Sequence, residues 1–279
     1  KNIALYQDIL NNYDSMAAVI TRELDAIKKE YGSKRRTSVE NAEEAVYEEK
    51  KMEETEVCFL MDRFGYMKLI DKNAYERNKE AAHNENRCMF LCMNTDKICI
   101  FTDKGKMHSI KAADIPLVRF RDKGTPADNL SNYDSSQERM LYVAPLGQIR
   151  QDQLLFVTRA SMCKLVEGTE FDVAKRTIAA TKLAQDDELV FVGSAGEMEQ
   201  VVFQSNGGYF LRFLKQEIST ARRAALGVRG MKLAQEDYVE HAYLLSGHQE
   251  YAISYHDREY SLNKVRLGKR DTRGIKPRS

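Results

Sequence analysis

The chain contains no apolar run long enough to cross a membrane as a helix, so we expect no contact with membranes. Of its 279 residues, 43% are hydrophobic and 30% are charged, which is typical of soluble globular proteins. The chain begins at Lys1 and no signal segment follows, so we expect a cytoplasmic fragment of a longer protein.

Cysteine is scarce, and its pattern excludes a disulfide framework. The five cysteines, an odd number, lie mostly inside apolar, strand-like runs: Cys58, Cys88, Cys92, Cys99 and Cys163. Such positions favour reduced thiols in a protein core, as expected in the cytosol. Paired two-residue spacings and an accompanying histidine cluster are both missing, so we expect no metal site.

The chain has little excess charge, with a formal net charge of +1. Residues 1–56 carry 9 basic and 13 acidic side chains, which leaves 34 basic and 29 acidic side chains for residues 57–279. That surplus is far from the strongly basic balance of a dedicated nucleic-acid binder. Any contact with a polyanion must therefore come from local clustering on one surface.

The sequence also lacks a recognisable catalytic arrangement. No nucleophile and base stand at a suggestive spacing, no phosphate-binding loop is present, and the five histidines share no spacing. We therefore predict no catalytic residue and no cofactor in this chain. A binding module is favoured over an enzyme that uses a propeller-like scaffold.

What the chain does contain is a strand unit that recurs at intervals of about fifty residues, a period typical of propellers and arrays. Each unit begins with an apolar run, a short turn and a second apolar or basic run. The five instances cover residues 57–70, 97–110, 153–166, 200–213 and, more weakly, 250–265. A single hairpin cannot bury its apolar face, so these units must stack or close radially into one body.

Further strand-like runs lie between the hairpins, at residues 89–93, 140–143, 188–192 and 237–245. Two hairpin strands and two intervening strands give about four strands a unit, as in a propeller blade. The sequence therefore predicts an all-β, propeller-like domain of about five four-stranded blades. The fifth unit stops without its second half, so a closed ring would need a strand from elsewhere, and the segment near 46–56 is the natural candidate.

The amino-terminal part predicts helices. Apolar residues between Met16 and Tyr31 recur at three- and four-residue spacing, which predicts a helix over 15–31. Asp14 or Ser15 is expected to cap its start, and Gly32 to end it in a left-handed turn. Residues 2–10 look like the end of an earlier helix. The glutamate-rich stretch 33–56 predicts a solvated connector, partly helical around 40–50 and extended near 52–56.

One run points to a known family. Residues 226–233 read Leu-Gly-Val-Arg-Gly-Met-Lys-Leu and are followed by an acidic turn and a strand beginning at Asp237. This run resembles the blade signature in the C-terminal domains of bacterial type IIA DNA topoisomerase A subunits. The hairpin turns at 104–106 and 206–208 and the loop at 111–116 fit the same family.

A second resemblance stands at the other end of the chain. Residues 20–32, followed by Arg-Arg-Thr at 35–37, resemble the last helix of the DNA breakage-and-reunion core of that family. The resemblance implies three parts: the helical end of that core (1–38), an acidic linker or entry strand (39–56) and a β-pinwheel DNA-binding domain (57–279). It also implies that the catalytic tyrosine and the metal-binding carboxylates lie outside this chain.

The resemblance implies a function for this part of the enzyme. The pinwheel would bind and bend duplex DNA without sequence preference and present it for strand passage by an ATP-dependent type II topoisomerase. The implied partners are duplex DNA, a second A subunit and the ATPase B subunit. The alternative is a propeller that serves as a protein-interaction platform, which the modest charge of the domain permits.

The chain departs from gyrase at one place. Gyrase A subunits carry a Gln-Arg-Arg-Gly-Gly-Lys-Gly box after the first hairpin, and wrapping of DNA requires it. Here residues 71–82 read Asp-Lys-Asn-Ala-Tyr-Glu-Arg-Asn-Lys-Glu-Ala-Ala, with two glutamates and no glycine. The chain therefore resembles a topoisomerase IV A subunit, or a divergent gyrase A subunit that has lost its box.

Candidate DNA contacts are the basic residues past each hairpin turn and in the loops that follow, because non-specific binding depends on phosphate neutralisation. They are Lys68, Lys72, Arg77, Lys79, Arg121, Lys123, Lys164, Lys175, Arg176, Arg212, Arg222, Arg223, Arg229, Lys232, Lys264, Lys269 and Arg270. The pairs at 175–176 and 222–223 are predicted to occupy matching places in consecutive units. For Arg229 a structural role, bonding backbone carbonyls, is an equal alternative.

Overall fold

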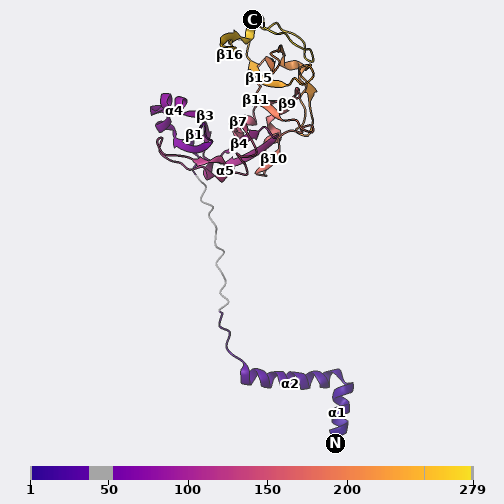
Figure 1. Ribbon diagram of the computed structural model, residues 1–279. Helices are drawn as coiled ribbons and strands as arrows, with labels where there is room; N and C mark the ends of the chain where they lie inside the picture. The colour runs from indigo at the N-terminus through magenta and orange to yellow at the C-terminus, as the bar shows by residue number, and fades with distance from the viewer. Residues whose placement is uncertain (1, 38–52, 248, 278–279) are drawn as a thin grey trace. The chain divides into compact units, whose positions relative to one another are not determined.

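The computed structural model describes residues 2–37, 53–247 and 249–277 (Figure 1). The chain divides into two compact units, Lys1–Lys51 and Met52–Ser279. Within the described residues, no helix is both long enough and apolar enough to cross a membrane.

The first unit consists of the two predicted helices, α1 (Asn2–Asn11) and α2 (Tyr13–Tyr31). The start of α2 is capped by Asn12, whose side chain accepts a hydrogen bond from the backbone N–H of Asp14. Asp14 and Ser15 were therefore the wrong residues for the cap. Gly32 follows α2 with φ −64° and ψ 125°, so the helix ends in extended backbone and not in the expected left-handed turn.

The second unit contains five antiparallel sheets, three of them with four strands in the described residues. The first consists of β3 (Asn86–Met93), β1 (Glu56–Asp62), β2 (Tyr66–Asp71) and β6 (Thr125–Pro126). The second consists of β10 (Thr177–Ala179), β5 (Lys106–Lys111), β4 (Lys97–Thr102) and β7 (Met140–Pro145). The third consists of β11 (Leu189–Ser194), β8 (Gln153–Thr158), β9 (Met162–Glu167) and β14 (Val228–Arg229).

The last two sheets are smaller. The fourth consists of β13 (Phe210–Leu214), β12 (Gln200–Ser205) and β15 (Val239–Leu245), and the fifth of β16 (Ala252–Tyr255) and β17 (Arg258–Ser261). The short helical elements are α3 (Lys72–Arg77), α4 (Lys79–Glu85), α5 (Ala127–Leu130), α6 (Leu146–Ile149) and the 3-10 turns η1 (Ala112–Asp114), η2 (Gly168–Phe171), η3 (Lys215–Glu217) and η4 (Leu262–Lys264). The predicted all-β architecture is confirmed.

In each four-stranded sheet, the outermost strand comes from the repeat that follows that sheet in the chain. Strand β6 comes after the second hairpin but pairs with β2 of the first sheet. In the same way β10 pairs with β5, and β14 pairs with β9. In the fourth sheet, a single bridge between Phe210 and Ile275 takes this place. Successive sheets are therefore tied together by exchanged segments.

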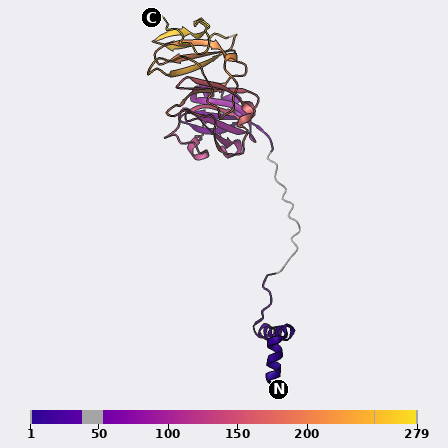
Figure 2. The same cartoon turned by 90° about the vertical axis from the view of Figure 1, so that its right-hand side faces the viewer.

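Both faces of the inner sheets are buried, which explains why their strands read as continuous apolar runs. Phe101 of β4 and Phe156 of β8 share one core cluster, with ring centroids 5.9 Å apart. Leu155 of β8 and Phe203 of β12 share the next. Figure 2 shows the resulting stack, from the purple first sheets at one end to the yellow fifth sheet at the other.

The far face of the first sheet is covered by α3 and α4. Tyr75 of α3 and Ala82 of α4 are buried against Cys58, Leu60 and Ile70 of the first hairpin. The stretch that stands in place of the gyrase box is thus a pair of short helices, begun by Asp71, whose carboxylate accepts hydrogen bonds from two backbone N–H groups of α3.

The expected ring-closing strand near 46–56 is not found where the structure describes that segment. Residues 46–52 lie outside the described residues. The carbonyl of Thr55 accepts a hydrogen bond from the backbone N–H of Asn94, and β1 begins at Glu56. This part of the chain therefore joins the first sheet and not the fifth.

The cysteines lie as the sequence predicted. All five are free, and all but Cys88 are buried. Burial raises the pKa of Cys99 and Cys163 to about 12, so both are neutral thiols at physiological pH.

Candidate nucleic-acid interface

Basic residues gather in the connectors that lead from each hairpin to its exchanged outer strand. Parallel bridges join Leu69 to Leu117, Leu165 to Thr220 and Arg212 to Leu267, which sets three of these connectors in register. Two residues after each bridge stand, in order, Arg119, Arg222 and Lys269, all exposed. The fold therefore repeats one exposed cation at the same place in three loops.

The pair Lys175–Arg176 does not match Arg222–Arg223, contrary to the sequence prediction. Arg176 directly precedes β10, whereas Arg223 stands five residues before β14. The connector between β9 and β10 is four residues shorter than the one between β13 and β14. The shorter connector therefore has no counterpart of the stretch that carries Arg222. Both Lys175 and Arg176 are exposed, and Arg176 lies 3.7 Å from the carboxylate of Asp114.

The basic side chains on the second strand of the hairpins form hydrogen bonds inside the fold. Lys68, His108 and Lys164 are equivalent, since they pair with Leu60, Ile100 and Phe156 in the same register. Lys68 donates to the carbonyl of Asp122 at 2.9 Å and also to that of Phe120. Each of these side chains thus bonds to the connector or exchanged strand beside it.

Lys164 is the extreme case, with 1% of its surface exposed. Its ammonium donates to the carbonyls of Arg222 at 3.1 Å, Arg223 at 2.7 Å and Ala225 at 2.7 Å. Burial lowers the pKa of this lysine to about 8. Arg212 stands one residue out of register, opposite Val202. Its guanidinium donates to the carbonyls of Asn263 and Val265.

Three further predicted arginines have internal partners. Arg223 donates to the carbonyl of Ala179 in β10 and lies 3.7 Å from Glu170. Arg270 donates to the carbonyls of Glu217 and Arg229. Arg229 forms a two-pronged ion pair with Asp271, which raises the pKa of the arginine and lowers that of the aspartate. Its structural alternative thus takes the form of an ion pair, not of bonds to carbonyls.

The remaining predicted residues are exposed. Lys72 pairs with Glu56, and Lys123 lies over the ring of Tyr66 at 4.2 Å. Arg77 donates to the carbonyl of Asn73 in its own helix. The others are Lys79, Arg121, Lys232, Lys264 and Lys269.

A hollow lies between segments of neighbouring sheets. It is an open cavity of about 810 Å³. Its lining includes Glu170, Thr181, Lys182, Arg222 and Arg223. The backbone N–H of Lys182 donates to the carbonyl of Arg223, which fixes the two segments together. The sequence did not single out Lys182. Its only signal is its place just past the exchanged strand.

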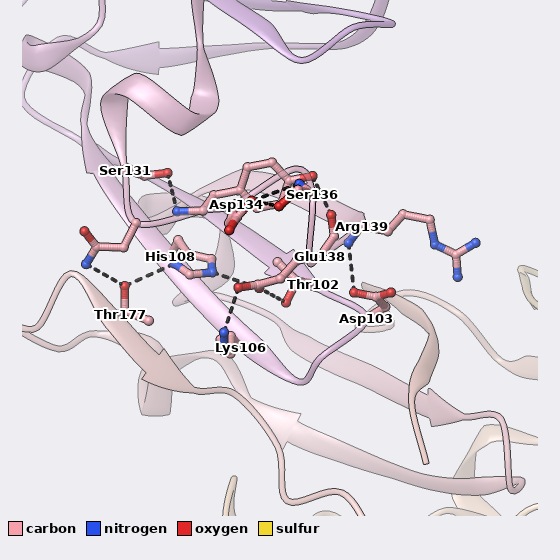
Figure 3. A network of polar contacts seen from close by, with 12 residues as sticks. Thr102, Asp103, Lys106, His108, Ser131, Asp134, Ser136, Glu138, Arg139 and Thr177 are labelled. Atoms are coloured by element: carbon pink, nitrogen blue, oxygen red, sulfur yellow. Dashed lines mark hydrogen bonds and ion pairs between the residues drawn. The ribbon is translucent and has the colours of Figure 1, made fainter. Parts of the chain in front are cut away.

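At the equivalent place in the second sheet, His108 belongs to a buried polar network (Figure 3). Glu138 accepts hydrogen bonds from Thr102 at 2.7 Å, Lys106 at 2.7 Å and His108 at 3.1 Å. The other ring nitrogen of His108 lies 3.1 Å from the hydroxyl of Thr177 in β10. This network therefore holds the exchanged strand β10 against the second sheet.

Comparison with known proteins agrees with this architecture. Residues 96–135, 152–195 and 199–246 match the family described as "DNA gyrase C-terminal domain, beta-propeller". The A subunit of DNA gyrase from Clostridium acetobutylicum is 29% identical over 82% of this chain and 29% of its own length. The A subunit of DNA topoisomerase 4 from Bacillus subtilis is 26% identical over 86% of this chain and 31% of its own length.

A crystal structure of the C-terminal domain of DNA topoisomerase IV superposes with a TM-score of 0.69. It covers 80% of this chain and 72% of that chain, at 23% sequence identity, so it supports the fold alone. The chain spans about a third of the length of the curated relatives it matches.

Proposed function

We propose that the repeat domain of this chain binds duplex DNA without sequence preference. The domain matches the family of C-terminal domains found in the A subunits of gyrase and resembles that of topoisomerase IV. The observation that carries this proposal is the exposed cation repeated in three of the connectors, at Arg119, Arg222 and Lys269. Cations spaced along a continuous edge meet successive phosphates of a duplex whatever its sequence.

The proposed footprint divides the predicted residues into two groups. Exposed cations, together with Lys182 at the cavity, contact phosphate. Residues whose donors are taken by backbone carbonyls, such as Lys68, Lys164 and Arg212, support the loops instead. Phosphate contact remains a prediction for every residue of the first group.

In the parent protein the domain would present DNA to the strand-passage machinery of an ATP-dependent type II topoisomerase. Its partners there would be a second A subunit and the ATPase B subunit, and its location the cytoplasm. The catalytic tyrosine would lie outside this chain, so the fragment alone performs no chemistry. The named relatives, of which this chain spans about a third, support these assignments.

Replacing Arg119, Arg222 and Lys269 together with alanine should flatten the salt dependence of DNA binding. Each lost phosphate contact removes about 0.9 from the slope of log K against log[salt], so three remove roughly 2.7. The slope is measured by fluorescence anisotropy with duplexes of unrelated sequence. The matched control replaces Lys28, Lys29 and Lys34, which are exposed cations outside the repeat domain.

An unchanged slope in the triple variant would remove these connectors from the footprint. Weak wild-type binding that is insensitive to salt, together with tight binding to a protein, would favour the protein-interaction alternative over DNA.

The domain is expected to bind and bend DNA without trapping a positive superhelical wrap. Bending a site of 20–30 base pairs costs of order 1–6 kcal/mol, which many phosphate contacts must offset. Helices α3 and α4 stand in place of the gyrase box, and they expose Glu76 and Glu80 beside Lys72, Arg77 and Lys79. Ligation of a nicked circle in the presence of the domain measures the wrap, and a large positive shift of linking number would contradict this expectation.

A further inference from the structure

Lys164 carries a positive charge in an almost fully buried position. Burying an ammonium is unfavourable unless every N–H group finds an acceptor. Here the three protons of the ammonium match the three carbonyls of Arg222, Arg223 and Ala225. The lysine therefore binds one loop, residues 222–225, at three points from the inside.

The same loop is held from its other sides as well. The carboxylate of Glu170 accepts the backbone N–H of Arg223 at 3.0 Å, and the Arg223 side chain reaches the carbonyl of Ala179 at 3.2 Å. For Arg222, in contrast, the structure records no side-chain partner among the described residues, and its side chain lines the cavity next to Lys182. The backbone of the loop is fixed while one guanidinium stays available.

We infer that Lys164 is a positioning residue for DNA binding: its ammonium holds loop 222–225 so that Arg222 and Lys182 face the same phosphate. This inference rests on the proposed function. Lys164 itself never touches DNA. Its effect on affinity passes entirely through Arg222, whose place on the cavity wall depends on the carbonyls that Lys164 binds.

The first sheet offers a matched comparison. Lys68 occupies the equivalent position and binds the carbonyls of Phe120 and Asp122, on either side of Arg121. If each buried or half-buried lysine positions the cation of its own loop, Lys68 is coupled to Arg119, the equivalent of Arg222, and Lys164 to Arg222. A general loss of stability would not distinguish between the two loops.

Protonation gives a second, independent readout. With a pKa of about 8, Lys164 loses its proton near pH 8, whereas exposed lysines stay charged to about pH 10. A neutral amine has two N–H groups, so one of the three carbonyls then loses its donor. The charged groups that act on Lys164 are Glu170, which favours the ammonium, and Arg223, which opposes it.

The experiment is a pair of crossed double-mutant cycles on DNA affinity at pH 7 and about 0.1 M salt. One cycle combines Lys164→Met with Arg222→Ala, and the other combines Lys68→Met with Arg222→Ala. At this salt concentration one phosphate contact corresponds to about an eightfold change in affinity. Lys164→Met and Arg222→Ala should each weaken binding by up to that factor, and the double variant no further. Lys68→Met and Arg222→Ala should instead multiply their effects.

Multiplicative losses for Lys164→Met and Arg222→Ala would overturn the inference, because Lys164 would then act independently of Arg222. Thermal melting shows whether each variant folds. If Lys164→Met does not fold, the pH series decides: wild-type affinity should fall between pH 7 and 9, and that of Arg222→Ala should not. Equal falls in both proteins would overturn the inference. Salt-insensitive or absent binding by the wild type would instead overturn the proposed function.

Discussion

Replacing Gly227 with alanine is expected to destabilise the repeat domain by roughly 3 kcal/mol. Gly227 has φ +91°, and a Cβ atom added there would lie 2.4 Å from the carbonyl oxygen of Cys163. That oxygen belongs to the backbone of β9, so it cannot move aside without breaking the sheet. The exchanged strand β14 begins at the next residue, and we expect its pairing with β9 to be lost together with the glycine.

The measurement is thermal unfolding, in which a loss of this size lowers the melting temperature by roughly 6–12 °C. The matched control is Gly268→Ala. Gly268 follows its parallel bridge directly, and the equivalent residues in the other two connectors are Val118 and Ala221. A side chain is therefore accommodated at that place. A Gly227→Ala variant that melts like the control would contradict this account of the glycine.

The same geometry explains why the signature around Gly227 exists. Gly124 and Gly274 precede two of the other three exchanged segments, and an added Cβ atom would lie 2.4 Å from the Met67 carbonyl and 2.5 Å from that of Phe210. In each case the outer segment approaches the neighbouring strand too closely for a side chain. At these three places the close approach of the exchanged segment, and not the turn alone, requires the glycine, whereas β10 is exchanged with Arg176 before it.

The fold could be predicted because the inner strands are long and apolar on both faces. A short apolar run such as the one at 153–158 is stable as a strand that is buried between sheets. Strand exchange could not be predicted by periodicity, since β6 and β14 are each two residues long. Two residues are too few to show the alternation of apolar and polar side chains that identifies a strand. The partner of each, a hairpin strand 58–67 residues earlier in the chain, becomes visible only in the folded structure.

The site was predicted less completely than the fold. A basic residue within an apolar strand, such as Lys164 in Cys-Lys-Leu-Val, can reach solvent or turn toward a carbonyl, and the sequence is the same in both cases. The matching of Lys175–Arg176 with Arg222–Arg223 failed because connector length, not sequence distance, decides which residues share a place. Arg119, Arg222 and Lys269 became equivalent only through the bridges of their loops.

Glu138 shows the opposite case, in which a residue of a polar turn is buried. Residues 134–138 read Asp-Ser-Ser-Gln-Glu, which is typical of a solvated loop. Glu138 is nevertheless 6% exposed, because Thr102, Lys106 and His108 all direct donors toward it. Acceptors for buried donors come from across the fold, so their burial cannot be predicted from local sequence.

Replacing Glu138 with glutamine is expected to cost roughly 2–3 kcal/mol of stability at pH 7. The amide oxygen can accept from at most two donors where the carboxylate accepts from three, and the amide N–H group would be directed at a remaining donor. Lys106 is half exposed and regains water, which keeps the loss at the low end for a broken buried pair. His108 is 1% exposed, so water cannot replace a hydrogen bond that it loses. Chemical denaturation of both proteins measures the difference.

The pH dependence of that difference tests the cause. Burial raises the pKa of Glu138, but the hydrogen bonds from Lys106, His108 and Thr102 outweigh it and hold the pKa below the ordinary value of 4.5. A carboxylate with a lowered pKa in the folded state stabilises the fold above its unfolded pKa and loses this effect as the pH falls through the folded value. The difference in unfolding free energy between wild type and Glu138→Gln should therefore be constant near pH 7 and become smaller below pH 4.5.

The control is Glu197→Gln, which removes the same charge from an exposed residue with no recorded partner in the described part of the chain. Its stability should match that of wild type from pH 4 to pH 8 within about 0.5 kcal/mol. Because net charge changes equally in both variants, only the hydrogen bonds to Glu138 distinguish them. A constant gap for Glu138→Gln down to pH 3.5 would mean that shape and packing, and not the ionised carboxylate, hold β10 in place.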